Sequence, residues 1–109
     1  MKRASILAFL FLVPISLFAG VIFGTIRIGD RPLREGIEVC VQSKDGPICA
    51  NTDPYGGFRL EVPETGVVVL EVRLPGRQNP TLRVNSFSTP TRYELELFRE
   101  GDQWRLRIK

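Results

Sequence analysis

A strict alternation of apolar and polar side chains is the feature that most limits what this chain can fold into. It is clearest from Thr52 to Val62, where an Asp-Pro-Tyr-Gly-Gly turn leads into five alternating residues. Phe58, Leu60 and Val62 then share one face of an extended segment, and the charged residues between them share the other. The pattern predicts a β-strand with one buried face that starts at a tight surface turn.

The same alternation recurs along the chain after residue 20, and no segment there shows the three-and-four spacing of an amphipathic helix. The predicted strands span residues 21–28, 37–42, 47–51, 58–62, 67–74, 81–85, 92–98 and 103–108. Seven or eight short antiparallel strands in a chain of this length predict an all-β fold, a small β-sandwich.

The N-terminus has the layout of a secretory signal peptide, because two basic residues precede the apolar run 6–18. Small residues at Ala19 and Gly20 suit cleavage, so we expect a signal peptide over 1–20 and a single sandwich domain over 21–109. The mature protein is then secreted or periplasmic, without stable membrane insertion. The alternative is that an uncleaved helix tethers the protein to the membrane, since the apolar stretch is about as long as the 20 residues that a transmembrane helix requires.

Size and charge narrow the function classes. Loss of the leader leaves 89 of the 109 residues, enough for one small core. It also removes Lys2 and Arg3, which lowers the formal net charge from +3 to +1. The remaining arginines are spread along the strands, so no nucleic-acid partner is expected.

Cys40 and Cys49 flank a Ser-Lys-Asp-Gly turn. If Val41 pairs with Ile48 and Val39 with Ala50, hydrophobic patterning places the two cysteines directly opposite each other on the outward face. In an exported protein this predicts a disulfide, with two free thiols as the alternative.

Two further hairpins are predicted from turn signals. A turn centred on Glu100-Gly101 would set Leu97 opposite Trp104 and Glu96 opposite Arg105. A Glu-Thr-Gly turn at residues 64–66 would pair 58–62 with 68–72.

The chain contains no histidine, which removes the usual general base and the commonest metal ligand. Its carboxylates are scattered over strand surfaces and separate turns, and no glycine-rich phosphate loop opens onto a helix. We therefore expect no enzymatic activity, no metal and no cofactor.

Four residues form the candidate binding surface: Tyr55, Val67, Val69 and Phe87. Val67 and Val69 lie opposite the core face of their strand, while the two aromatic residues lie in loops. Cover by a neighbouring loop or by the second sheet is the alternative, since isolated apolar surface residues are common.

The order of residues resembles the carboxypeptidase regulatory-like domain, a transthyretin-like Greek-key β-sandwich. The matching segments are Gly24-Thr25-Ile26, Gly29 to Leu33, Gly36 to Val39, Thr52 to Leu60, and Pro63 to Leu70. The resemblance implies a folding or interaction module without catalytic residues, although here the module stands alone and carries a cysteine pair that is not general in the family.

The resulting functional hypothesis is an exported, non-enzymatic module that binds or supports another envelope or extracellular protein through an edge strand or end loops. The alternative is a small-ligand or carbohydrate-binding carrier that uses Tyr55, Phe87 or Trp104 as a stacking platform.

Overall fold

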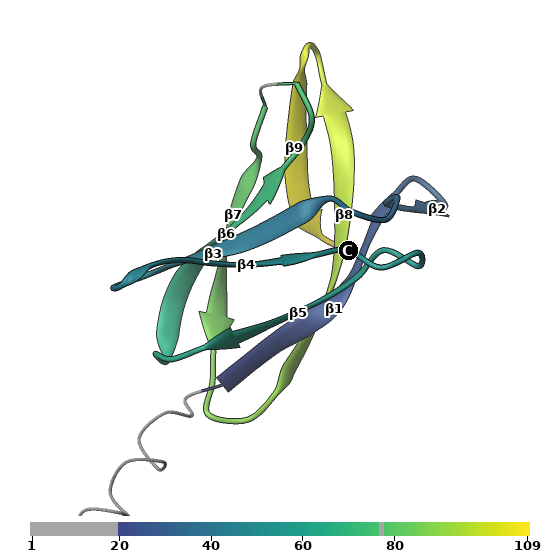
Figure 1. The fold of residues 1–109 in the computed structure, drawn as a ribbon. Helices are drawn as coiled ribbons and strands as arrows, with labels where there is room; N and C mark the ends of the chain where they lie inside the picture. The colour runs from purple at the N-terminus through teal and green to yellow at the C-terminus, as the bar shows by residue number, and fades with distance from the viewer. Residues whose placement is uncertain (1–19, 77) are drawn as a thin grey trace, which may run out of the picture.

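The structure, a computed structural model, describes residues 20–76 and 78–109, and this part of the chain is all β (Figure 1). Its strands are β1 Gly20–Ile28, β2 Arg31–Pro32, β3 Glu38–Ser43, β4 Gly46–Asn51, β5 Gly57–Val62, β6 Gly66–Arg73, β7 Thr81–Ser86, β8 Thr91–Glu100 and β9 Gln103–Ile108. Eight of them are the predicted strands, within two residues at each end. The two-residue β2 was not predicted, so the described strands number nine and not seven or eight.

The expected signal peptide falls almost wholly on residues 1–19, which lie outside the described residues. Gly20 is already the first residue of β1 and pairs with Val62. The described part of the chain contains no helix that is long and apolar enough to cross a membrane.

The strands form two sheets in a sandwich-like arrangement. In sheet A, β1 pairs with β5 and β2 on one side and with β8 on the other, and β9 closes the far edge; sheet B has the order β4, β3, β6, β7. The prediction of antiparallel strands is wrong at one place, because β1 and β8 run parallel.

One contiguous core lies between the sheets, and it is built from the alternate side chains that the sequence pattern assigned to buried faces. The buried members are Ile22, Ile26, Leu33, Ile37, Val39, Val41, Phe58, Leu60, Val62, Val68, Leu70, Val72, Val84, Leu95, Leu97 and Leu106. Both sheets contribute, so each sheet hides one face from water and leaves the other polar.

Gly24 allows β1 and β8 to approach closely. A Cβ atom at this position would lie 1.8 Å from the carbonyl oxygen of Tyr93 in β8, an impossible contact with backbone. The parallel pairing therefore requires glycine here, because any side chain would separate the two strands.

The predicted partners in two hairpins are wrong. In the last hairpin the register is shifted by two residues, so that Leu97 lies opposite Leu106 and Glu96 opposite Arg107. The turn is Gly101-Asp102, with Gly101 at φ +64°, which suits the first central position of a type II′ turn.

The predicted β5–β6 hairpin does not form. β5 pairs with β1 in sheet A, whereas β6 pairs with β3 and β7 in sheet B. The apolar residues of both strands nevertheless reach the shared core from opposite sheets.

The cysteine hairpin is confirmed. Cys40 lies opposite Cys49, Val41 opposite Ile48 and Val39 opposite Ala50, and the two sulfurs form a disulfide with the Cα atoms 4.0 Å apart. Cys40 lies on the outer face of sheet B as expected, but it is fully buried there and not exposed.

Removal of this disulfide should lower the free energy of unfolding by about 2.5 kcal/mol, the loop-entropy value for a bridge that closes a short loop. The measurement is urea unfolding of the Cys40→Ala, Cys49→Ala variant against the oxidised protein. An unchanged urea midpoint in the variant would contradict the expectation. So would a midpoint of the unsubstituted protein that does not shift when a reducing agent is added.

Candidate functional site

The four residues expected to form a binding surface come from three segments of the chain. Val67 and Val69 lie on the outer face of sheet B, beside Asn85 and Arg83 of β7. Val67 is 62% exposed, whereas Val69 is half-buried.

The two aromatic members of that set are also exposed and come from two other segments of the chain. Phe87 follows β7, and Tyr55 lies in the β4–β5 turn with 77% of its surface exposed. Asp53 builds this turn, since its Oδ1 accepts hydrogen bonds from the backbone N–H groups of Tyr55 and Gly57, both at 2.8 Å. The Asp side chain thus has the local structural role that turn residues commonly have.

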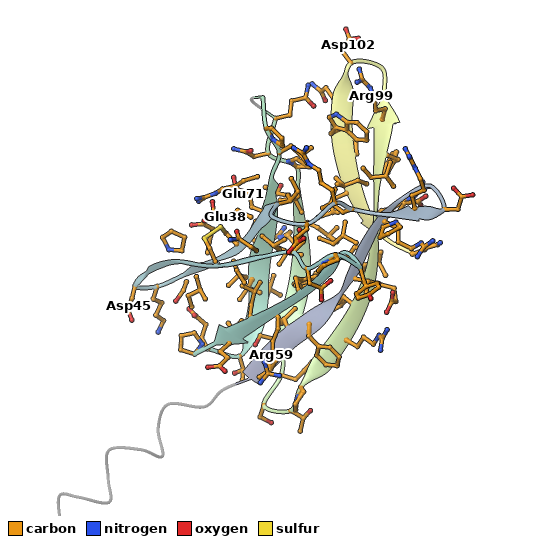
Figure 2. The ribbon with its side chains drawn as sticks, turned by 45° about the vertical axis from the view of Figure 1, so that its right-hand side comes forward. Glu38, Asp45, Arg59, Glu71, Arg99 and Asp102 are labelled. Carbon is orange, nitrogen blue, oxygen red and sulfur yellow. A yellow bond between two sulfur atoms is a disulfide. The ribbon has the colours of Figure 1, made fainter. Side chains whose placement is uncertain are left out.

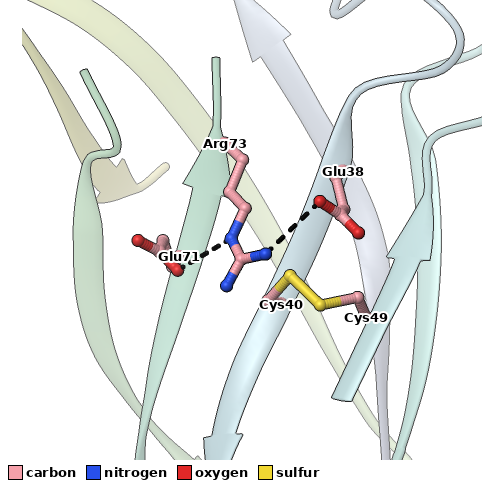
Figure 3. Close-up of polar contacts among 5 residues, drawn as sticks. All are labelled: Glu38, Cys40, Cys49, Glu71 and Arg73. Carbon is pink, nitrogen blue, oxygen red and sulfur yellow. Dashed lines mark hydrogen bonds and ion pairs between the residues drawn. A yellow bond between two sulfur atoms is a disulfide. The ribbon is translucent and has the colours of Figure 1, made fainter. Parts of the chain in front are cut away.

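A charged cluster covers the disulfide on the outer face of sheet B (Figure 3). Arg73 contacts Glu71 at 3.2 Å and Glu38 at 3.4 Å. The hydrogen bond to Glu71 is the main cause that raises the pKa of Arg73, so the guanidinium stays charged and bridges the two carboxylates.

Glu38, Cys40 and Cys49 also bring three potential ligand atoms within 4.8 Å of one another, the one such group in residues 20–76 and 78–109. Both sulfurs are in the disulfide, however, and metals bind the thiolate form. The oxidised cluster therefore offers no thiolate ligands.

The outer face of sheet A carries rows of paired charges. Arg92 contacts Glu94 at 2.5 Å and Arg107 contacts Glu96 at 2.9 Å. The hydrogen bond from the Thr25 hydroxyl, followed by that from Arg92, lowers the pKa of Glu94 from its ordinary value of 4.5. Acid–base catalysis near neutral pH needs a raised carboxyl pKa, so Glu94 is the opposite of a poised general acid.

The side of the sandwich where β7 and β9 form the sheet edges is partly closed by side chains. The Tyr93 hydroxyl donates to the Asn85 carbonyl at 2.8 Å and accepts from the Asn85 N–H at 3.0 Å. Gln78 binds the β9 edge in the same manner, since its side chain accepts from the Trp104 N–H at 2.6 Å and donates to the Asp102 carbonyl at 2.8 Å. Some of the polar atoms that an added strand would use, those of Asn85, Trp104 and Asp102, are thereby occupied.

The opposite side, between β4 and β5, is open. The 4.0 Å Cα separation of Cys40 and Cys49 is typical of a non-hydrogen-bonded antiparallel pair. In such a pair the backbone N–H and C=O groups of both residues point away from the partner strand. Cys49 and Asn51 thus direct these groups to the free edge of β4, and no group within the described ranges bonds to them.

Two hollows flank this edge. Figure 1 shows how β4 and β5 diverge from their shared turn. One hollow, of about 510 Å³, is lined by Ala50, Asn51 and Phe23 among others, and the second, of about 500 Å³, by Ile48 and Val62. Arg59 of β5, labelled in Figure 2, lines both. We call these two hollows the furrow. The furrow has apolar and charged walls and lies beside the open edge.

A third hollow, a cleft of about 560 Å³, contains Trp104 and lies at the end of the sandwich near β2. Neither Tyr55 nor Phe87 lines it, so the three aromatic residues considered as a stacking platform do not share a site.

Comparison with known proteins identifies no family for this fold. No protein-family model and no curated protein matches the chain.

The open edge and the Trp104 cleft were both missed by inspection of the sequence. Pro47 carried a usable signal for the first, because proline within a sheet is confined to edge strands, where its missing N–H leaves the ladder intact. The cleft had no such signal, since its walls come from five separated segments of the sequence.

Replacement of Thr25 by Val should raise the pKa of Glu94 toward its ordinary value, because the carboxylate loses the hydroxyl that stabilises its charged form. In the unsubstituted protein the lowered pKa stabilises the fold above the unfolded-state value, and this contribution is lost as the pH falls through the folded-state pKa. The variant should lose less stability over that acid window. NMR titration of the Glu94 carboxyl carbon measures the shift, with Thr81→Val as the control; an unmoved midpoint would refute it.

Replacement of Tyr93 by Phe should lower the free energy of unfolding by about 1 kcal/mol, because both hydrogen bonds between its hydroxyl and the Asn85 backbone disappear. Tyr55→Phe is the matched control and should change stability by less than about 0.5 kcal/mol, since its ring is exposed. Thermal and urea unfolding give both values, and equal effects of the two substitutions would show that the Asn85 contacts are unimportant.

Proposed function

We propose that the protein is an exported, non-enzymatic β-sandwich module that binds another envelope or extracellular protein, and that an extended segment of this partner adds to the free edge of β4. The observation that carries the proposal is the difference between the two sides of the sandwich. Side chains occupy edge positions on β7 and β9, whereas Cys49 and Asn51 present unpaired backbone groups beside the furrow.

Strand addition suits the chemistry of this edge. Cys49 and Asn51 offer two N–H donors and two C=O acceptors, which can bond a partner backbone of any sequence. Alternate side chains of the partner would face Ile48 and Ala50, which pack against the core and line the hollows. Pro47 has no N–H, so it limits addition to the half of β4 nearer Asn51.

The disulfide supports this role by holding β4 to β3 at Cys49 itself. The edge stays in an extended form before a partner arrives, and binding then costs less conformational entropy. The same bridge is compatible with an oxidising, exported location.

We also propose that the fold belongs with the transthyretin-like Greek-key sandwiches that the sequence resembles. Support comes from the chain path, which leaves sheet B after β4, crosses to β5 in sheet A and returns to β6 in sheet B. The resemblance implies an interaction module, in agreement with the proposed strand addition.

The test uses a photo-reactive amino acid at Pro47 on the β4 edge, or at Thr81 on the β7 edge, followed by irradiation in the native envelope. We expect a cross-linked partner from position 47 and none from position 81. Asn51→Pro should reduce the cross-link about tenfold, because it removes an edge N–H and its ring obstructs the incoming strand. Asn51 uses no β3 ladder bond, so the fold should remain, as Trp104 fluorescence can verify.

The matched control is Arg83→Pro, which alters an outward N–H of the β7 edge in the same way and should leave the position 47 cross-link unchanged. Equal cross-linking from both edges, or a cross-link that survives Asn51→Pro in folded protein, would exclude strand addition at β4.

A further inference from the structure

The cleft near β2 is apolar inside and basic at its mouth. Its apolar walls are Ile28, Leu33, Ile37, Leu74, Leu97 and Trp104. Leu33, Ile37 and Leu97 are buried, while the other three are half-buried and leave apolar surface open to the cleft. The volume of about 560 Å³ falls within the roughly 300–1,000 Å³ of small-molecule sites.

Two arginines line the mouth of this cleft, Arg31 of β2 and Arg34 of the following loop. Both are exposed, and neither forms an ion pair within residues 20–76 and 78–109. This differs from the outer sheet faces, where Arg59, Arg73 and Arg92 each contact a carboxylate. The mouth thus offers two guanidinium groups that make no ion pair in the described chain, although the exposed Asp30 and Glu35 adjoin them in sequence.

Trp104 is held in place on the wall of the cleft. Its backbone N–H is bonded to Gln78, and the Arg99 guanidinium lies 5.4 Å from the centre of its ring. Figure 2 shows Arg99 near the β8–β9 turn, which Asp102 marks. Arg99 makes no ion pair in the described ranges either, so it adds a third cation near the aromatic wall.

We propose that this cleft binds a free single-chain organic carboxylate, with its alkyl tail against the apolar walls and its carboxylate between Arg31 and Arg34. A tail gains from burial on the half-buried apolar surface, and a carboxylate matches the fork geometry of guanidinium groups. A neutral ligand would leave the two charges without a partner. This site is separate from the β4 edge and does not depend on strand addition there.

Trp104 is the only tryptophan of the chain, so its fluorescence reports directly on the cleft. The full-length gene is expressed so that the product can be exported, and the protein is purified in whatever processed form the cell produces. It is then titrated with octanoate, decanoate and dodecanoate below their critical micelle concentrations. We expect saturable fluorescence changes and an affinity that rises about fourfold for each methylene that enters the cleft. The alcohols of equal length should bind about tenfold more weakly.

Arg31→Gln with Arg34→Gln should weaken dodecanoate binding about tenfold, as expected for two exposed charge pairs. Arg83→Gln, an exposed arginine on sheet B, is the matched control and should not change it. The double variant should keep the position 47 cross-link, so a failure of this proposal and a failure of strand addition at β4 are distinguishable.

Four results would overturn the proposal. The first two are the absence of saturable binding by both fluorescence and calorimetry, and equal affinity for the acids and the alcohols. The third is tighter binding of an apolar peptide than of dodecanoate. The fourth is binding to phosphatidylglycerol vesicles without binding of the monomeric acid. A concentration-dependent dimer that shields Trp104 and resists dodecanoate would equally show that a second copy occupies the cleft.

Discussion

The parallel pairing of β1 with β8 is the contact on which the rest of sheet A depends, since β1 is joined to β5 and β2 on its other side and β8 carries β9. It exists because Gly24 has no side chain where the Tyr93 carbonyl passes. Tyr93 also connects the sheets, because its hydroxyl bonds the backbone of β7 in sheet B. One close backbone approach thus fixes the central strands and the closed side together.

The sequence predicted which residues face the core far better than which strands are neighbours. Alternation determines the face of a strand, and a register shift of two residues preserves that face, which is why the β8–β9 register was wrong while Leu95, Leu97 and Leu106 were still buried correctly. At β5 and β6 the turn signal was read as a hairpin although the chain changes sheets there. The cysteine hairpin succeeded because a short turn and two opposed apolar pairs left one consistent register.

The candidate sites were less predictable than the fold for a related reason. Exposed Val67, Phe87 and Tyr55 could be identified as apolar surface residues, but their positions relative to one another depend on long-range pairing. The open β4 edge and the Trp104 cleft exist only as relations between segments distant in sequence. Pro47 alone carried local information about an edge.

The β1–β8 pairing has a consequence for how this chain acquires its structure if it crosses a membrane with its N-terminus first. Paired residues such as Thr25 and Glu94 are separated by 69 positions, so the central place in sheet A stays vacant until nearly all of the chain has been delivered. The cysteine hairpin closes over a separation of only nine and can form and oxidise early. Since long-range pairing is slow compared with local hairpins, the topology itself delays completion of the sandwich until the C-terminal strands are free to pair.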